Sequence, residues 1–477
     1  MKQETGVRDF ERYSDEILKK YKVPGFAIGL AKDGELSYKK EFGYRDMEAE
    51  LPLSADTVFG VGSITKAFTA TSILQLHENG KLSVNDHITK HLPEFRTPYE
   101  EYTKQMTIHH FLTHTSGLPP LLTLIAAIKR SMEKDPEFGG DQQESPLDAI
   151  REIDTYTELM DSIANAEFTL LGEPGTEFSY SNDAYALLGA IIERVSGMPY
   201  EQYVQENILK PAGMHNSGFH YKDMIGHEDI AVLYNMREQD GEEIVFRSDN
   251  PWDAPAMRAA GFLKSTVNDM LKFTEIIRNS GEAGNVRILS PESVELMTTP
   301  HIKCAHGSYY GYGLTIIPDY FGYKLIHHGG DIKGVTAQMN ILPELNVTGI
   351  SLANLAGAPS SKLLFSAFAS RHLDKSLDAL HLNVEVVDLD LESLKEYEGT
   401  FISGDGMVNE VYVEDEKLYL ATAGMSAVVL EPIGDDQFLL TIREMDSTIR
   451  FVRDKDKKIH RIEFVLRQIP KIHDALK

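Results

Sequence analysis

A serine stands three residues before a lysine where an apolar helical pattern begins, at Ser63-Ile-Thr-Lys66. A serine hydroxyl is a poor nucleophile near neutral pH and needs a base within hydrogen-bond reach. Residues three apart on a helix lie on the same face, so the two side chains can meet. Burial or a neighbouring cation would lower the pKa of the lysine. The pattern therefore predicts a nucleophile with its own base, and the alternative is a helix-capping serine near a surface lysine.

The spacing alone is weak evidence, because Ser-x-x-Lys also occurs at Ser131-Met-Glu-Lys134. That match lies in a charged stretch with no apolar helix behind it, and we take it as a chance match. Tyr180-Ser-Asn182 is more informative, since it enters a strong helical pattern. A phenol near cations can shuttle protons, and an amide can orient both a lysine and a substrate carbonyl.

A third pattern, His328-Gly-Gly330, follows a β-like run. Glycines let a strand edge approach a ligand closely, and a backbone N–H there can donate to an oxyanion. A nucleophile at a helix N-terminus supplies another such donor from its own backbone. The three patterns together supply a nucleophile, a base and donors for an oxyanion.

In this order, the three patterns resemble the serine β-lactamase and penicillin-binding-protein-like hydrolases, on the class C β-lactamase, D-aminopeptidase and esterase side. In that superfamily the third pattern is Lys-Thr-Gly or His-x-Gly. The resemblance covers residues 7 to 370 and includes these flanking phrases: VPGFAIGLAKDG, VFGVGSITKAFTA, GKLSVNDHITKHLPEF, FLTHTSGLP, PGTEFSYSNDAYALLGAIIERVSG, ILKPAGM, AAGFLKSTVNDMLKF and YGYGL.

The resemblance implies an acyl-enzyme mechanism. Ser63 would attack the carbonyl carbon, while Lys66 and Tyr180 would share the general-base and general-acid roles. His328 would support the proton network of Tyr180. No cofactor and no metal are implied.

The resemblance also implies a substrate-binding side. Asn182 would contact the substrate amide. Gly330 would keep the strand edge close to the substrate, and the N–H groups of Ser63 and Asp331 would form the oxyanion hole.

Two departures from the family pattern bear on the substrate. Asp331 stands where many β-lactamases have serine or threonine, and a carboxylate there should repel a substrate's carboxylate. His328 is usually neutral near pH 7 and attracts that carboxylate less than a lysine would. Both changes weaken the case for β-lactam turnover, although Lys333 and His327 could offset Asp331.

We therefore expect a peptidase or amidase that tolerates or prefers D-residues. A carboxylesterase or a β-lactamase of the same superfamily is the alternative activity. A catalytically silent penicillin-binding or scaffold protein is the alternative of another class, and the intact patterns argue against it.

Together with the elements expected along the chain, the resemblance implies an α+β fold. We expect a β-lactamase/transpeptidase-like catalytic domain over residues 1–375, with an antiparallel sheet flanked by helices, an all-helical part and an excursion at about 120–165. Residues 376–392 read as a linker. Residues 393–477 read as a small all-β sandwich or barrel, and phrases such as VYVEDEKLYL resemble the lipocalin-like domain appended to some family members.

Local patterns predict several elements of the catalytic domain. An amphipathic helix is expected over residues 10–21, and a hairpin around K32-DGE. Ser63 is expected at the N-cap of its helix, and a second strong helix over residues 182–195. Four β-like runs between residues 309 and 355 are expected to form adjacent antiparallel strands.

The composition limits the partners. The 477 residues carry 47 Lys and Arg against 73 Asp and Glu, a formal net charge of −26, which argues against nucleic acid and against an anionic membrane surface. The N-terminus lacks the pattern of a signal peptide, so we expect a cytoplasmic protein, with a homo-oligomer as an open alternative to a monomer. One cysteine, Cys304, excludes an intramolecular disulfide. His109, His110 and His114 lack acidic or thiol partners nearby, which argues against zinc.

Overall fold

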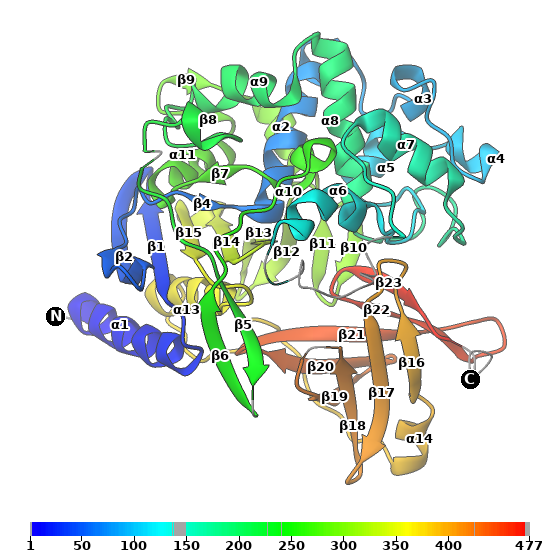
Figure 1. Cartoon of the computed structure of the whole chain (residues 1–477). Helices are drawn as coiled ribbons and strands as arrows, with labels where there is room; N and C mark the ends of the chain where they lie inside the picture. The colour runs from blue at the N-terminus through cyan, green and yellow to red at the C-terminus, as the bar shows by residue number, and fades with distance from the viewer. Residues whose placement is uncertain are drawn as a thin grey trace.

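The computed structural model describes residues 2–135, 137, 149–226, 228–239, 241–423 and 425–472. Its centre is a nine-stranded antiparallel sheet in the order β10-β11-β12-β13-β14-β15-β1-β2-β3 (Figure 1). The strands are β1 (Gly25–Lys32), β2 (Glu35–Asp46), β3 (Leu51–Pro52), β10 (Ile302–Ala305), β11 (Ser308–Tyr310), β12 (Thr315–Tyr320), β13 (Tyr323–Ile332), β14 (Val335–Leu342) and β15 (Val347–Ala353).

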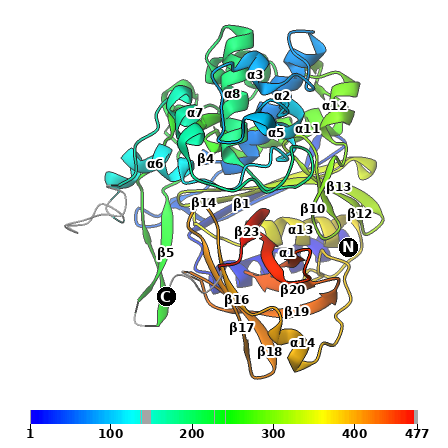
Figure 2. The same cartoon turned by 90° about the vertical axis from the view of Figure 1, so that its right-hand side faces the viewer.

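Helices cover both faces of this sheet (Figure 2). Strand β1 shows why, because its alternate residues enter two different cores. Ala27 and Ala31 belong to the core beneath α2 (Thr65–Glu78) and α11 (Val267–Arg278). Phe26 and Ile28 belong to the core beneath α1 (Lys2–Lys20) and α13 (Ser360–His372). The central strands β14 and β15 are buried along their whole length, which matches their mostly apolar sequences.

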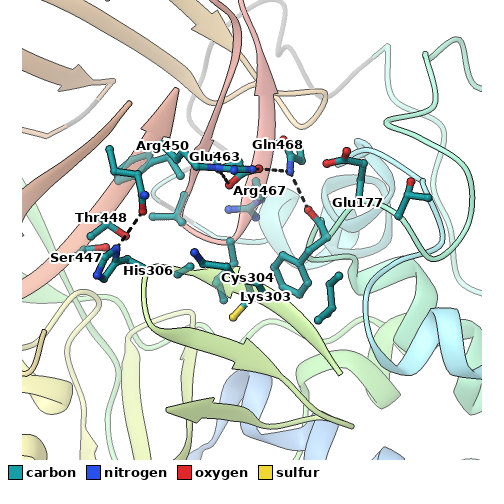
Figure 3. A pocket seen from close by; sticks show the side chains of 18 residues that line it. Glu177, Lys303, Cys304, His306, Ser447, Thr448, Arg450, Glu463, Arg467 and Gln468 are labelled. Carbon is teal, nitrogen blue, oxygen red and sulfur yellow. Dashed lines mark hydrogen bonds and ion pairs between the residues drawn. The ribbon is translucent and has the colours of Figure 1, made fainter. Parts of the chain in front are cut away.

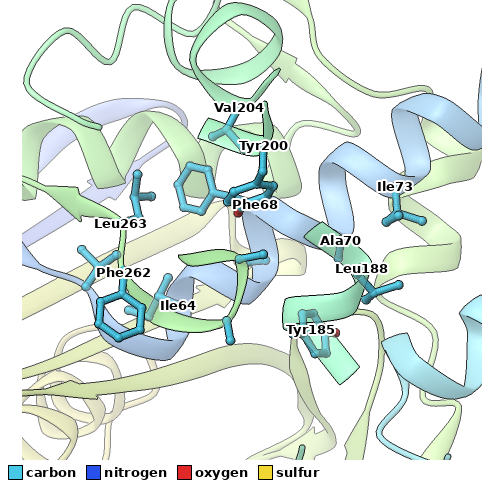
Figure 4. Close-up of a cluster of buried hydrophobic side chains, with 14 of the residues drawn as sticks. Ile64, Phe68, Ala70, Ile73, Tyr185, Leu188, Tyr200, Val204, Phe262 and Leu263 are labelled. Atoms are coloured by element: carbon cyan, nitrogen blue, oxygen red, sulfur yellow. The ribbon is translucent and has the colours of Figure 1, made fainter. Parts of the chain in front are cut away.

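The helical part lies above the sheet and surrounds α2. Residues 65 to 76 of α2 are all buried, and the helix has no polar face. Figure 4 shows side chains from its neighbours closing around Phe68 and Ala70, among them Tyr185, Leu188 and Tyr200. A catalytic group at the start of α2 is therefore held by the core.

The remaining elements surround this framework. The helices are η1 (Gly62–Ile64), α3 (Ile88–His91), α4 (Glu100–Thr103), α5 (Ile108–Leu112), α6 (Thr123–Glu133), α7 (Tyr156–Asn165), α8 (Asn182–Ser196), α9 (Tyr200–Val204), η2 (Gln205–Leu209), η3 (Tyr221–Asp223), η4 (Pro255–Met257), α10 (Arg258–Gly261), α12 (Pro291–Met297) and η5 (Pro343–Leu345). Three short antiparallel pairs complete them: β4 (Phe59–Gly60) with β7 (Lys264–Ser265), β5 (Tyr234–Gln239) with β6 (Glu242–Arg247), and β8 (Glu282–Ala283) with β9 (Val286–Arg287).

The C-terminal part is an eight-stranded antiparallel meander in chain order. After the short helix α14 (Leu391–Lys395) it comprises β16 (Gly399–Ile402), β17 (Val408–Glu414), β18 (Lys417–Thr422), β19 (Val428–Gly434), β20 (Gln437–Ile442), β21 (Met445–Arg453), β22 (Ile459–Phe464) and β23 (Arg467–Pro470). A bridge between Phe401 and Lys471 joins its two ends, so the sheet forms a nearly closed barrel. Its own apolar core includes Phe401, Phe438 and Phe451.

The predicted fold class is confirmed by this architecture. The first helix, the hairpin of β1 and β2, the adjacent strands β12 to β15 and the helix α8 all form where the patterns place them. The predicted N-cap at Ser63 is wrong. The helix begins at Thr65, with Ile64 at its N-cap and no side-chain cap, and Ser63 lies in the preceding 3₁₀ turn η1.

Candidate active site

Ser63 lies in a tight turn between β4 and α2. Gly62 has a left-handed φ of +50°, which a residue with a side chain rarely adopts. The turn leaves the Ser63 side chain half-buried and not engaged in capping the helix. Its hydroxyl is therefore free to face Lys66, one turn further along the chain.

Lys66 is fully buried and donates to three oxygens. Its Nζ lies 3.3 Å from Ser63 Oγ, 2.7 Å from Asn182 Oδ1 and 2.6 Å from the carbonyl oxygen of Ala260. Burial lowers its pKa well below the usual value, the charge of Arg467 lowers it further, and the carboxylate of Asp183 opposes the shift. A lysine with a lowered pKa can lose its proton and act as a base toward Ser63.

Helix α8 positions Tyr180 and Asn182. Ser181 is its N-cap and accepts a hydrogen bond of 3.1 Å from the N–H of Ala184, so Tyr180 stands just before the helix and Asn182 is its first residue. The Lys66 ammonium lies 4.6 Å from the centre of the Tyr180 ring. All three predicted groups therefore meet at Ser63.

The Tyr180 phenol is protonated at neutral pH. Burial raises its pKa above the usual range, while contacts with Ser63 and the charge of Arg467 oppose the rise. Its oxygen is buried and makes no hydrogen bond to the described residues, although it lies beside the Ser63 hydroxyl. In this state the phenol can donate a proton, which suits a general acid better than a resting base.

The end of β13 is pressed against the turn that carries Ser63. A Cβ atom on Gly62 would lie 2.6 Å from the Asp331 nitrogen, and one on Gly330 would lie 2.0 Å from the Val61 carbonyl oxygen. Neither position tolerates a side chain, so the two glycines permit this approach. The arrangement brings the backbone of Asp331 beside the nucleophile turn. The Asp331 residue is exposed to solvent, although the protein around its carboxyl group raises the pKa of that group.

His328 faces Tyr310 rather than Tyr180. Its Nε2 lies 3.0 Å from the Tyr310 hydroxyl and its Nδ1 lies 2.6 Å from the Gly329 carbonyl, so Nδ1 donates and Nε2 accepts. The rings of His328 and Tyr180 have centroids 6.3 Å apart. Burial lowers the pKa of His328 to about 4, so the imidazole is neutral. The predicted support of Tyr180 therefore has no direct hydrogen bond in this structure.

The family model "Beta-lactamase" matches residues 10–365. The chain belongs to the beta-lactamase family. A second family model, "Domain of unknown function (DUF3471)", matches residues 385–475, which include the barrel.

Two relatives share extended stretches with this beta-lactamase-family chain. Penicillin-binding protein 4* of Bacillus subtilis is 25% identical over 453 residues, which are 89% of either chain. An uncharacterized protein of Mycobacterium tuberculosis is 32% identical over 275 residues, 55% of this chain and 64% of that protein. The chain thus spans just under two thirds of the mycobacterial protein's length.

Two solved structures are similar to this chain. The octameric penicillin-binding protein homologue from Pyrococcus abyssi has 30% sequence identity and a TM-score of 0.68, with 97% of this chain and 99% of that chain covered. The D-amino acid amidase from Ochrobactrum anthropi SV3 has 25% identity and a TM-score of 0.56, with 73% and 91% covered. The first similarity includes the barrel, since it spans nearly the whole chain.

The sequence patterns missed three residues of this beta-lactamase-family site. Tyr310 holds His328, and His114 places its ring 4.3 Å from that of Tyr180 and accepts a hydrogen bond from the Ser181 N–H. Both residues lie in segments that resemble the family, FLTHTSGLP and YGYGL, and this resemblance could have marked them as candidates for the site. Arg467 comes from the barrel, and no local pattern marked it.

The two residues predicted to offset Asp331 are engaged in contacts of their own. Lys333 is buried in an ion pair of 2.6 Å with Asp135, and in a second with Glu137, both within the 120–165 excursion. His327 packs against Phe365 on the far face of the sheet, and burial lowers its pKa to about 3. His327 is therefore neutral, and the charge of Lys333 is balanced by two carboxylates.

The three histidines near α5 have structural roles. His109 Nδ1 lies 2.7 Å from the Tyr312 hydroxyl, and His110 Nδ1 accepts from the N–H of Thr107 in a capping box. His114 is buried against Tyr180. Within the described ranges, no group of three or more His, Cys, Asp or Glu side chains is arranged to hold a metal ion.

Proposed function

We propose that the chain is a serine hydrolase that forms an acyl-enzyme on Ser63. The observation that carries the proposal is the buried Lys66 ammonium 3.3 Å from Ser63 Oγ, with a lowered pKa. Neutral Lys66 would take the hydroxyl proton as Ser63 attacks the carbonyl carbon. Tyr180 would protonate the leaving group, and water would then release the acyl group.

The substrate side of the proposal rests on the remaining residues. Asn182, already bound to Lys66, would present its N–H₂ to the substrate amide. The N–H groups of Ser63 and Asp331 would stabilise the oxyanion, with Gly330 keeping the strand close. His328, neutral and held by Tyr310, would shape the site.

We propose a peptidase or amidase that tolerates or prefers D-residues as the substrate class. The similarity to the D-amino acid amidase supports this choice, and exposed Asp331 disfavours substrates with a carboxylate at that point. A carboxylesterase or β-lactamase of the same family is the alternative activity, and a silent penicillin-binding or scaffold protein is the alternative without catalysis.

We also propose the division into a catalytic domain over 1–375, a linker over 376–392 and a lipocalin-like domain over 393–477. The octameric homologue supports a homo-oligomeric assembly. Among the described residues no helix is long and apolar enough to cross a membrane. A cytoplasmic location stays a prediction.

The test is covalent labelling by a fluorophosphonate, followed by initial rates on matched peptides with D- or L-residues at the scissile site, a short-chain ester and a penicillin. Ser63→Ala should abolish both labelling and turnover. Ser131→Ala, from the chance Ser-x-x-Lys match, is the control and should leave both unchanged. Labelling that survives Ser63→Ala would refute the nucleophile, and ester cleavage alone would replace the peptidase with an esterase.

A further inference from the structure

The turn between β22 and β23 of the barrel contacts the loop that carries Tyr180. The N–H of Tyr180 donates a hydrogen bond of 2.8 Å to the carbonyl of Leu466, in the middle of this turn. Two further contacts hold the same loop: Gln468 Nε2 donates to the Phe178 carbonyl at 3.2 Å, and Arg461 pairs with Glu177 at 2.9 Å. The barrel therefore anchors the segment from which the phenol projects.

The turn itself is a two-residue hairpin turn. Val465 and Leu466 both have left-handed φ values, +44° and +64°, although such two-residue turns favour Asn and Gly. The barrel turns at Asp415–Glu416, Asp435–Asp436 and Arg443–Glu444 have the same pair of left-handed residues, so this backbone conformation is common to the hairpins of the barrel. Leu466 packs against the cluster of Phe178 and Tyr310, on which Tyr180 also rests. Leu466 therefore contacts the catalytic loop through its side chain as well as through its carbonyl.

Arg467 follows this turn and lies in the same pocket as Glu177 and Phe178 of the catalytic loop. Its side chain is 23% exposed, its guanidinium pairs with Asp405 at 3.1 Å, and it lines an interdomain pocket of about 330 Å³ (Figure 3). The pocket lies between the barrel and β10, next to Phe178. Arg467 is the largest charge effect from another residue on Lys66 and lowers the pKa of both Lys66 and Tyr180.

Other titratable groups face the same pair from the elements packed around it. These are Asp183 on α8, Asp331 and His328 on β13, His114 after α5, Tyr185 on α8 and Tyr310 on β11. His328 and His114 are neutral, because burial lowers their pKa, and the two tyrosines are protonated. Asp183 raises the pKa of Lys66 and Asp331 raises that of Tyr180, whereas Arg467 lowers both. The positive charge of Arg467 therefore balances the two carboxylates.

We propose that the β22–β23 turn is a working part of the catalytic centre, in which Leu466 fixes the loop that carries Tyr180 and Arg467, the next residue, is a positioning residue. The inference rests on the proposed function, since it assigns the barrel a role in the Ser63 reaction. It joins the C-terminal domain to the chemistry, whereas the sequence indicated a separate, appended unit.

The sign of the charge effect follows from proton balance. Lys66 must be neutral to accept the Ser63 proton, so the reaction slows when the pH falls below its pKa. Loss of the Arg467 charge raises that pKa, because a positive neighbour disfavours the protonated amine. The acidic limb of the rate profile should then move to higher pH, and activity lost near neutral pH should return under alkaline conditions.

The test uses the full-length chain with Arg467→Gln, Arg467→Lys and the matched control Arg453→Gln. Arg453 is also a barrel arginine, and it pairs with Asp436 at 2.9 Å. We expect Arg467→Gln to lower kcat/KM near pH 7 by about tenfold, with recovery at higher pH, as for a base held in its protonated form. Arg467→Lys should restore most of the rate, and Arg453→Gln should leave the profile unchanged.

Two results would overturn the proposal. An Arg467→Gln profile that keeps its shape and loses rate equally at every pH would indicate a purely structural residue, and a thermal melt identifies a misfolded variant. A change in KM confined to carboxylate-bearing substrates would make Arg467 a substrate-binding residue instead.

A second measurement does not depend on activity. Hydrogen exchange over residues 171–182 should be slow in the wild type and faster in Gln468→Leu, which loses its hydrogen bond to the Phe178 carbonyl. Equal exchange in both would refute the anchoring role. If the wild type fails to label at Ser63, the proposed function fails, while the exchange result still decides whether the barrel anchors the loop.

Discussion

Lys66 and Asn182, far apart in the sequence, are joined by a hydrogen bond of 2.7 Å between Nζ and Oδ1. The same ammonium reaches Ser63 at 3.3 Å, so the amide of Asn182 holds the base against the nucleophile. The carbonyl of Ala260 supplies a third acceptor. This arrangement fixes the direction of the amine before any substrate binds, which is the preorganisation that proton transfer needs.

Replacing Lys66 should remove the general base. Lys66→Met keeps most of the buried volume and should lower kcat by at least ~100-fold, the usual size of such a loss. Single-turnover acylation rates measure the effect directly. Lys134→Ala, in the chance motif, is the control and should be silent, because Lys134 is exposed at the end of α6. Near-normal acylation in Lys66→Met would remove Lys66 from the mechanism.

Replacing the Tyr180 hydroxyl should separate its chemistry from its packing. Tyr180→Phe keeps the ring beside His114 and the hydrogen bond from its N–H to Leu466, and should lower kcat by at least ~100-fold. The folded state should be unaffected in a thermal melt. Tyr412→Phe in the barrel is a matched control. A rate within tenfold of the wild type would show that the phenol transfers no proton in the slow step.

The pH dependence should follow Lys66 and not His328. The pKa of His328 is about 4, so it stays neutral across the range from pH 5 to 8. Activity should fall with falling pH as Lys66 gains its proton. His328→Gln should lower kcat/KM by at most ~10-fold, through the loss of the Tyr310 hydrogen bond, and leave the limb in place. If the acidic limb of the pH–rate profile shifts in His328→Gln, the titrating group is His328 and not Lys66.

Asp331 should control the response to anionic substrates. Asp331→Ser removes the carboxyl group of an exposed residue at the end of β13 and keeps the backbone N–H. We expect kcat/KM for a penicillin to rise at least ~10-fold relative to that for a neutral ester, because like charges at a binding site cost free energy. Asp388→Ser, on an exposed carboxylate before α14, should not change that ratio. An unchanged ratio in Asp331→Ser would place the discrimination elsewhere.

Much of the site could be predicted because its motifs lie at the ends of strongly patterned elements. The helix after Asn182 is apolar on one side and has a serine N-cap, so its start was visible in the sequence. The glycines at the end of β13 signalled a close approach, and the structure gives the reason at Gly330. These features depend on local sequence, which a single chain reveals.

The missed features depend on contacts between distant segments. Ser63 before an apolar run looks like a cap, but β13 packs on Gly62 and the chain forms a 3₁₀ turn there. The role of Tyr310 could not be predicted, because its hydrogen bond to His328 forms only when β12 brings β11 and β13 together in the sheet. Arg467 follows a barrel turn that lies far along the chain from the catalytic sheet, and tertiary packing alone brings that turn to the loop of Tyr180.

The buried thiol of Cys304 gives the interface between the barrel and the catalytic sheet a natural reporter. Cys304 lies on β10 at the interdomain pocket and is 9% exposed, and burial raises its pKa to about 12. A thiol in that state reacts slowly with alkylating reagents. The alkylation rate of Cys304 therefore measures how often the barrel separates from β10. No engineered label is needed, and the chain has no second cysteine that would react.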